Sequence, residues 1–471
     1  MNTPVPGMPV LPRARLADAA GINSTHFALP VPRDDRRRLA FGWLMLAIVA
    51  LIGAGVLSIL LVISRAPYVK DWFPLADFFH VALVVHVDLS VLVWFVAFAG
   101  MLWTINGTTR FLDLARTSLA LCLAGTVLMA SAPFLGRGGP IMSNYVPVLD
   151  DPLFLSGLIV FGSGFALLTL RSLLTPVRVG LPLDGAGALR FGLNTAAVAA
   201  GVALLALTWS FASIPPDYAG RQYYELLFWG SGHVIQFTWT LMMLVAWLWL
   251  ASLCGAAIPL TPRVTLLLFA IGLVSVFVVP IIYLSWDIAS VEHMKMHTWL
   301  MRFGGGLAIL PLGMAIVIGM VRAGQGGAAV RPLRSALIAS MTLFVVGGAF
   351  GFLIQGNDVR IPAHYHGSIV GITLALMGLA YALLPEFGRS APATRLAEWQ
   401  PWIFGAGQLL HIIGLVWSGG YGVQRKVAGS AQVLRSTQEI AGMGLMGVGG
   451  LVAITGGLLF VVVVYQARKR D

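Results

Sequence analysis

Long apolar runs separated by short polar segments make up almost the whole chain. Twelve runs come close to or exceed the ~20 residues that a helix needs to cross a bilayer. They occupy residues 40–64, 75–102, 113–135, 152–175, 191–213, 224–255, 264–286, 296–321, 334–355, 364–385, 401–418 and 441–467. The pattern predicts an all-α membrane protein: one twelve-helix transmembrane domain over 39–468, a polar cytoplasmic N-terminal tail over 1–38 and a short cytoplasmic C-terminal end over 469–471.

Composition agrees with this fold class. Hydrophobic residues make up 58% of the chain, charged residues make up 10%, and the mean hydropathy is +0.86, which excludes a soluble globule. Cys122 and Cys254 lie in separate apolar runs, so no disulfide framework, CxxC pair or CxxCH heme attachment site is present. Any heme is therefore held by ligation and packing.

The net charge of +11 reflects membrane topology rather than nucleic-acid binding. Arg36–Arg38 precede the first run, and a basic cluster at 468–470 follows the last. Both ends are therefore expected in the cytoplasm, which an even number of spans allows. Residues 1–32 have no uninterrupted apolar core and do not resemble a signal peptide.

This orientation gathers the histidines toward the outer half of the membrane. Polar groups at such depth are costly unless they face the bundle and have partners, so a layer of metal or heme ligands is indicated. Seven of the nine histidines fall at the start of, or in the first half of, the second, sixth, eighth and tenth spans: His80, His86, His233, His293, His297, His364 and His366.

His364 and His366 open the tenth span. Two positions on a helix differ by about 200°, so these imidazoles cannot share one metal ion but can each ligate a separate heme iron. The alternative is a polar pair that caps a membrane helix. Between the last two spans, Arg425 and Lys426 are suited to neutralise heme propionates, or are solvated loop charges; Arg360 is open to the same two interpretations.

With these features the chain resembles the catalytic subunit (subunit I) of the heme-copper oxidase superfamily, in a divergent form similar to the nitric oxide reductases. The resemblance rests on twelve spans, a histidine in the second, the segment 228–237 in the sixth, and His-x-His in the tenth. It implies a low-spin heme held by His86 and His366 and a high-spin heme held by His364. His80 is a rival of His86, which is preferred for its His-x-Asp-Leu context.

The same resemblance implies a non-heme metal held by His233. Two family features are missing: Phe237 stands where the oxidases often have a tyrosine, and no adjacent His-His pair follows the seventh span. Replacement ligands are expected from Glu292, His293 and His297. The two histidines are four residues apart and share a helix face, so they can bind one ion. An oxygen ligand from Glu292 would favour iron over copper. Alternatively these three cap the eighth span and pair with propionates or a partner subunit.

The remaining polar and small residues are given structural roles. His411 is expected to pack inside the bundle, and Gly304–Gly306 are expected to permit close helix approach. Single hydroxyls at Thr208, Ser210 and Thr298 are open as proton-path steps, although membrane hydroxyls more often bond back to their own helix.

The predicted function is reduction of a small gaseous substrate, nitric oxide to nitrous oxide, by a diheme oxidoreductase that also holds a non-heme iron or copper. Electrons are expected from a partner subunit with a cupredoxin or cytochrome c domain, with quinol as the alternative donor. Two alternatives remain open. One is a terminal oxidase that reduces dioxygen to water, with Tyr283 as the replacement tyrosine. The other is a diheme electron-transfer or gas-sensing subunit. The expected setting is the lipid bilayer of a bacterial plasma membrane, with no nucleic-acid partner.

Overall fold

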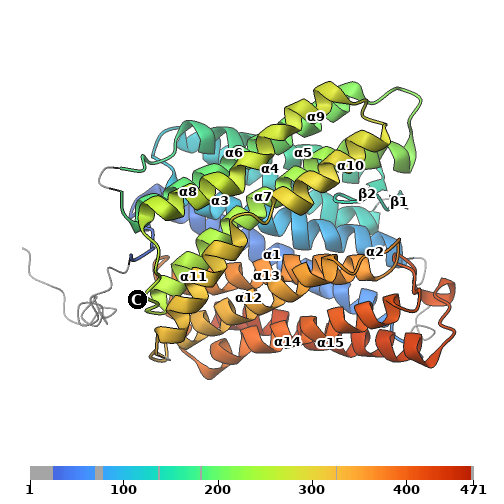
Figure 1. Cartoon of the computed structure of the whole chain (residues 1–471). Helices are drawn as coiled ribbons and strands as arrows, with labels where there is room; N and C mark the ends of the chain where they lie inside the picture. The colour runs from blue at the N-terminus through green and yellow to red at the C-terminus, as the bar shows by residue number, and fades with distance from the viewer. Residues whose placement is uncertain (1–24, 69–77, 136–137, 181–182, 325, 468–471) are drawn as a thin grey trace, which may run out of the picture.

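A computed structural model of the chain describes residues 25–68, 78–135, 138–180, 183–324 and 326–467. Most of the predicted N-terminal tail and the basic cluster at 468–470 lie outside this description. Within it, twelve helices are long and apolar enough to cross a membrane, which confirms the predicted twelve-helix bundle. They run antiparallel through one bundle (Figure 1).

Nine of these described spans are single helices, and the other three combine shorter helices. The single helices are α1 (Asp35–Ile63), α4 (Leu112–Leu135), α5 (Pro152–Leu174), α6 (Gly185–Ser213), α7 (Gly220–Leu253), α12 (Arg331–Gly351), α13 (Arg360–Leu383), α14 (Arg395–Gly419) and α15 (Thr437–Gln466). The second span joins α2 (Phe78–Val87), η3 (Asp88–Val93) and α3 (Trp94–Asn106), and the seventh joins α8 (Pro262–Val274), η4 (Ser275–Val278) and α9 (Val279–Ser285). The eighth contains α10 (Val291–Trp299), η5 (Leu300–Gly304) and α11 (Ile309–Arg322).

Three spans lie in the middle of the bundle. In the most apolar 18-residue window of each span, 61% of the residues are buried for Phe78–Asn106, 83% for Gly220–Leu253 and 78% for Arg360–Leu383, against at most 44% for the other nine. These are the second, sixth and tenth spans. The second and tenth carry the histidines predicted to bind heme iron, and the sixth carries His233, predicted to bind the non-heme metal. Side chains on these helices therefore face protein rather than lipid.

A small β-hairpin marks one end of the bundle. Strands β1 (Gly139–Ile141) and β2 (Val148–Asp150) pair antiparallel between α4 and α5. In Figure 1 they lie at the same end as the starts of α2 and α10, which we call the hairpin end. Because consecutive spans alternate in direction, α7 and α13 also begin there.

Glycines set how closely neighbouring helices approach. A Cβ at Gly407 of α14 would lie 2.3 Å from the Ala453 nitrogen of α15, and one at Gly347 of α12 would lie 2.5 Å from the Gly367 carbonyl carbon of α13. Only glycine fits at such contacts, as expected for membrane helices that pack through small residues. The rigid α12–α13 and α14–α15 pairs hold the loops and histidines at the hairpin end.

Two histidine-bearing spans contain π-helical turns. η3 begins two residues after His86, and η5 begins three residues after His297. A π turn inserts one residue into the helical ladder and so changes which face the following residues present. Such turns occur often at functional sites, and here each lies directly beyond a predicted ligand.

Candidate heme and metal site

The tenth span directs its two histidines to different neighbours. His364 Nδ1–H donates to the Gly347 carbonyl oxygen of α12 at 2.8 Å. His366 instead lies against His411 of α14, with ring centres 5.0 Å apart. This divergence is what an i, i+2 spacing on a helix requires. Each ring is therefore available to a different metal ion.

His86, His366 and His411 form one group, called here the His366 cluster. The three rings lie within electrostatic reach of one another and come from α2, α13 and α14. His86 Nδ1–H donates to the Ala54 carbonyl of α1 at 2.9 Å, which leaves Nε2 free. A ligand histidine commonly has its second nitrogen anchored in this way, because the anchor fixes both tautomer and ring orientation.

The structure separates His80 from this cluster. Its Nε2–H donates to the Lys426 carbonyl at 3.0 Å, and its ring lies edge-on to Phe79 at the start of α2. His80 therefore faces the loop after α14, whereas His86 faces the interior. This placement favours His86 over its rival.

Three more histidines come together between α7 and α10, and we call them the three-histidine centre. The ring centres of His293 and His297 are 4.6 Å apart, and those of His233 and His297 are 6.4 Å apart. All three side chains are buried. The i, i+4 pair predicted on the eighth span thus faces the sixth-span histidine.

Glycines in α7 create the space for this centre. A Cβ at Gly230 would lie 2.2 Å from the Tyr283 hydroxyl oxygen and 3.1 Å from His297 Nε2. A Cβ at Gly232 would lie 2.1 Å from the Tyr145 ring. The glycines beside His233 therefore admit one tyrosine on each side of it.

The donor atoms of the centre fit a metal ion. His233 Nδ1–H donates to the Trp229 carbonyl at 2.7 Å and His297 Nδ1–H to the His293 carbonyl at 3.0 Å, so both Nε2 atoms point elsewhere. His297 Nε2 and His293 Nδ1 are buried without a hydrogen-bond partner. Each unpaired buried nitrogen costs about 1–3 kcal/mol, a cost that ligation would remove.

The His233 and His297 rings are farther apart than two rings on one ion, whereas His293 and His297 are close enough. Two imidazoles bound at ~2.0 Å to a tetrahedral ion have centres roughly 5 Å apart. The His233–His297 separation is 6.4 Å, and no group of three His, Cys, Asp or Glu residues in the described chain is spaced to hold an ion as it stands. Binding would draw α7 and α10 side chains together by about 1 Å to reach that separation.

Tyr283 of α9 lies beside the same centre. Its ring centre is 4.7 Å from that of His293 and 5.4 Å from that of His297. Its hydroxyl donates to the Ala206 carbonyl at 3.0 Å and lies 2.7 Å from Ser210 Oγ, both on α6. The tyrosine therefore brings an exchangeable hydroxyl proton to the centre, next to a second hydroxyl.

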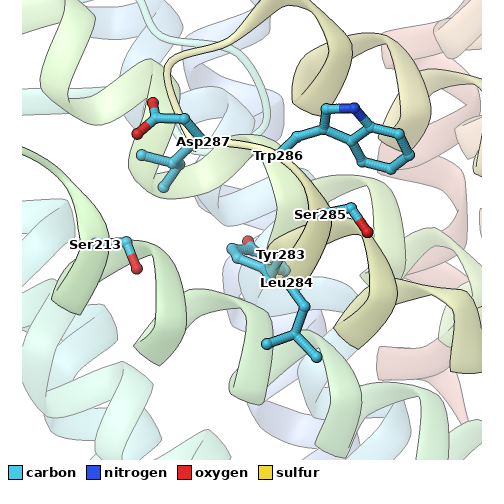
Figure 2. Close-up of a pocket in the computed structure, with 7 residues that line it drawn as sticks. Ser213, Tyr283, Leu284, Ser285, Trp286 and Asp287 are labelled. Carbon is cyan, nitrogen blue, oxygen red and sulfur yellow. The ribbon is translucent and has the colours of Figure 1, made fainter.

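A cavity of about 370 Å³ reaches Tyr283 from the hairpin end. Ser213 lines it from α6, Leu284 and Ser285 line it from α9, and Asp287 lines it from the segment after α9 (Figure 2). The carboxylate and hydroxyls make this approach polar. It connects the surroundings of Asp287 with the residue that contacts the three-histidine centre.

The prediction that Glu292 is a ligand of the three-histidine centre is corrected, and the sixth span lacks a tyrosine as expected. Glu292 lies on the exposed side of α10, whereas His293 and His297 are buried, so the structure does not place its carboxylate with the three-histidine centre. Adjacent positions on a helix differ by about 100°, which explains the separation. Phe237 is buried one turn after His233, so the sixth span supplies no tyrosine there.

The remaining hydroxyls and glycines behave largely as expected. Thr298 and Thr208 bond back to carbonyls of their own helices, and Thr298 Oγ1 also lies 3.4 Å from His233 Nε2, whereas Ser210 contacts Tyr283. Of the three consecutive glycines, only Gly304 makes a close inter-helix approach, since its Cβ would lie 2.5 Å from that of Ser275.

The predicted propionate cations join a polar network at the hairpin end. Lys426 Nζ donates to the Met142 carbonyl at 2.7 Å, and Arg425 Nη2 donates to Asn144 Oδ1 at 3.1 Å. Asn144 also donates through its backbone nitrogen and side-chain amide to the Glu225 carboxylate. Arg425 Nε is buried without a partner, which suits a further anionic acceptor.

Burial and the neighbouring Arg425 lower the pKa of Lys426 to about 8, although Glu225 acts in the opposite direction. This ammonium is therefore held in a place where a positive charge is poorly solvated. A nearby carboxylate would relieve that penalty. The pair fits the role of neutralising propionates.

Sequence reasoning missed a third cation in this region. Arg65, just after α1, donates from Nε to Gln432 Oε1 at 3.0 Å and lies within electrostatic reach of Tyr365. Its position at the hairpin end of a span was the available signal. Arg360, in contrast, is paired with Asp358 at 2.6 Å, so its charge is already compensated.

The fold and these histidines define a class of protein: a polytopic membrane bundle whose innermost helices present imidazoles with free nitrogens, the donor set that suits heme iron. Comparison with known sequences identifies the family. The chain belongs to the family described as cytochrome c and quinol oxidase polypeptide I, which it matches over residues 38–453. It is therefore a subunit of a heme-binding, heme-copper oxidase-type oxidoreductase.

Two relatives extend over most of the chain. An uncharacterized protein of Rickettsia prowazekii is 28% identical, with 91% of this chain and 96% of the relative covered. An uncharacterized protein of Aquifex aeolicus is 30% identical, with 74% and 84% covered. Their names give no substrate.

Proposed function

We propose that the chain is the catalytic subunit of a diheme reductase of a diatomic gas, with dioxygen as the first candidate substrate and nitric oxide as the second. His86 and His366 would hold a low-spin heme, His364 a high-spin heme, and the three-histidine centre a non-heme iron or copper. These groups would supply electron transfer and the place where the gas is bound. The unpaired buried nitrogens of His293 and His297 and the carbonyl-anchored rings of His86, His233 and His364 support this ligand set.

The position of Tyr283 is the observation that carries the choice of substrate. Dioxygen reduction needs four electrons, and a phenol beside the metal centre can give an electron and a proton. The expectation of nitric oxide reduction rested on the missing tyrosine at 237 and on a carboxylate from Glu292. Tyr283 lies 5.4 Å from His297, ring centre to ring centre, while Glu292 is exposed on α10.

Nitric oxide reduction is the second candidate because of Phe237 and the absent adjacent histidine pair. Coupling two NO molecules needs only two electrons and two protons, so it does not require the phenol. A centre that aligns two bound molecules is sufficient for that reaction. The wide spacing of His233 and His297 is compatible with such a centre.

Protons would reach the centre from the hairpin end. Asp287 and Ser213 line the cavity, and Ser210 lies 2.7 Å from the Tyr283 hydroxyl. In this role Ser210 would pass to Tyr283 Oη a proton taken up from the cavity side, which replaces the one that the phenol has donated and leaves Ser210 neutral. Among the described residues, no other hydroxyl is hydrogen-bonded to Tyr283.

Electrons would come from a partner subunit with a cupredoxin or cytochrome c domain, with quinol as the alternative. We place the protein in a bacterial plasma membrane with both termini in the cytoplasm. The Arg36–Arg38 cluster at the start of α1 and the bacterial sources of both relatives support this setting.

The test compares Tyr283→Phe with Tyr381→Phe in the purified protein with its native partner, under one electron donor. Loss of a general acid costs about 10²–10⁴-fold in rate, so Tyr283→Phe should lower dioxygen consumption at least 100-fold and nitric oxide consumption far less. Tyr381, whose hydroxyl donates to Gln400 far from the centre, is the matched control.

Other results decide between the remaining functions. No loss of dioxygen consumption would remove Tyr283 from the mechanism and favour nitric oxide. Equal loss of both activities would show that the phenol does not distinguish the two gases, and would remove the reason for preferring dioxygen. Two hemes with no further iron or copper in the purified protein would contradict a reductase and favour an electron-transfer or gas-sensing subunit.

A further inference from the structure

We propose that His411 positions the low-spin heme ligand by accepting a hydrogen bond from the Nδ1–H of His366. The inference rests on the proposed function, because it takes His366 as an axial ligand. It gives a role to a histidine that the sequence assigned only to packing. His411 itself does not touch the iron, so it is a positioning residue.

The tautomer of His411 follows from its own hydrogen bond. Its Nδ1 lies 3.0 Å from the Met446 carbonyl oxygen of α15. A carbonyl oxygen only accepts, so Nδ1 carries the hydrogen. In a neutral ring Nε2 then has a free lone pair, which makes it an acceptor.

His366 lacks the anchor that the other candidate ligands have. His86, His233 and His364 each donate from Nδ1 to a backbone carbonyl. Within the described residues, no ring nitrogen of His366 is hydrogen-bonded. Since ligand histidines almost always donate their second N–H, His366 needs an acceptor, and an imidazole lies against it.

The separation of the two rings suits this bond. An N–H···N bond of ~2.9 Å between two imidazoles places their ring centres roughly 5 Å apart. The observed distance between the centres of His366 and His411 is 5.0 Å, with ring planes at 56°. Stacked rings would instead be near parallel. A small rotation of His366 on binding iron brings the nitrogens into line.

Close packing fixes the acceptor in place. A Cβ at Gly449 of α15 would lie 2.3 Å from the His411 backbone nitrogen, and one at Gly450 would lie 3.3 Å from His411 Nδ1. His411 thus packs directly against the backbone of α15, and no flexible side chain separates the two. A rigid acceptor sets the plane of the ring that donates to it.

The bond has a predictable effect on the iron. An acceptor at Nδ1 draws the proton away from the ring and makes Nε2 of His366 a stronger electron donor. Stronger donation stabilises the ferric state, so the low-spin heme becomes harder to reduce. Removing the acceptor should therefore raise its reduction potential.

The experiment measures the low-spin heme in three variants of the full protein by redox titration and EPR. His411→Leu should shift the electron equilibrium between the two hemes about tenfold toward the low-spin heme, equivalent to 59 mV. His411→Gln, whose amide oxygen still accepts, should stay near the unmodified protein. Ser418→Ala is the matched control, because Ser418 lies seven residues along the same helix and bonds back to Gly414.

Unchanged potentials and EPR signals in His411→Leu would overturn the inference. If that variant does not fold, pulsed EPR of the unmodified protein decides, since the remote nitrogens of both axial imidazoles must be hydrogen-bonded and one unbonded nitrogen contradicts the role of His411. A protein with no low-spin heme signal overturns the proposed function and this inference together. Normal spectra with no effect at His411 overturn this inference alone.

Discussion

Replacing Gly230 by alanine tests how tightly the three-histidine centre and Tyr283 are fitted to α7. The added methyl group would lie 2.2 Å from the Tyr283 hydroxyl oxygen and 3.1 Å from His297 Nε2. Both neighbours are held, Tyr283 by α6 and His297 by its own helix. The methyl group therefore has to displace one of the two side chains.

The magnitude follows from two opposing effects. Overpacking a buried site costs about 1–3 kcal/mol, whereas alanine in a helix is favoured over glycine by ~1 kcal/mol. Gly162 of α5 isolates the second effect, because a methyl group added there would have no other atom within 4 Å. Gly162→Ala should be neutral or stabilising. The helix gain is common to both variants, so Gly230→Ala should be less stable than Gly162→Ala by the overpacking cost of about 1–3 kcal/mol.

The clash with Tyr283 can be removed separately. In Gly230→Ala/Tyr283→Phe the nearest ring carbon is Cζ, 3.2 Å from the methyl group. The double variant should therefore be about 1–2 kcal/mol more stable than the sum of the single effects. Unfolding of the purified protein measures this coupling, and metal content and gas consumption measure the centre. Activity should stay low in the double variant. If Gly230→Ala has the same unfolding stability and the same rate of gas consumption as Gly162→Ala, the reasoning is refuted.

Two further predictions concern the cations and the tenth span. Lys426 has a pKa of about 8 in the protein alone, and a propionate beside it raises that value. Loss of this cation stabilises ferric heme, so the heme potential should fall as pH rises above 8. Lys426→Arg should stay high and Lys426→Gln low at every pH, and parallel pH curves in all three would remove Lys426 from the propionate site. His366→Ala should abolish the low-spin heme spectrum and spare the high-spin one, and His364→Ala should do the reverse; retention of both spectra after each change would show that the two residues are not the ligands.

The architecture and the depth of the histidines were predictable from the sequence because the bilayer imposes them. A fixed hydrocarbon thickness sets the length of each apolar run, and the twelve runs correspond to the twelve spans. Alternating direction then placed His86, His233 and His366 near one end. The opposite directions of His364 and His366 followed from helix geometry alone.

The contacts within the site were not predictable, because they join residues far apart in the chain. Glu292 and His293 are adjacent, and only the face that α10 presents to α7 decides which one is buried. The approach of Tyr283 to His297 depends on a missing side chain at Gly230, in a third helix. Local patterns carry no information about such a three-way fit.

The β-hairpin loop connects the cation region with the metal centre. Asn144 accepts from Arg425 and Lys426 and donates to Glu225 at the start of α7. The next residue, Tyr145, lies 4.8 Å from the His233 ring, centre to centre, in the space left by Gly232.

The backbone of this loop is held in a costly conformation. The φ angle of Tyr145 is +67°, a left-handed geometry that costs a non-glycine residue about 1–2 kcal/mol. Surrounding contacts must outweigh that cost, and the bonds of Asn144 to Arg425, Lys426 and Glu225 supply them. Burial, with Glu225 nearby, also raises the pKa of Tyr145, so its phenol stays neutral. A charge change at Arg425 or Lys426 therefore acts through Asn144 on the ring that covers His233, which mechanically links the proposed heme-propionate and non-heme metal sites.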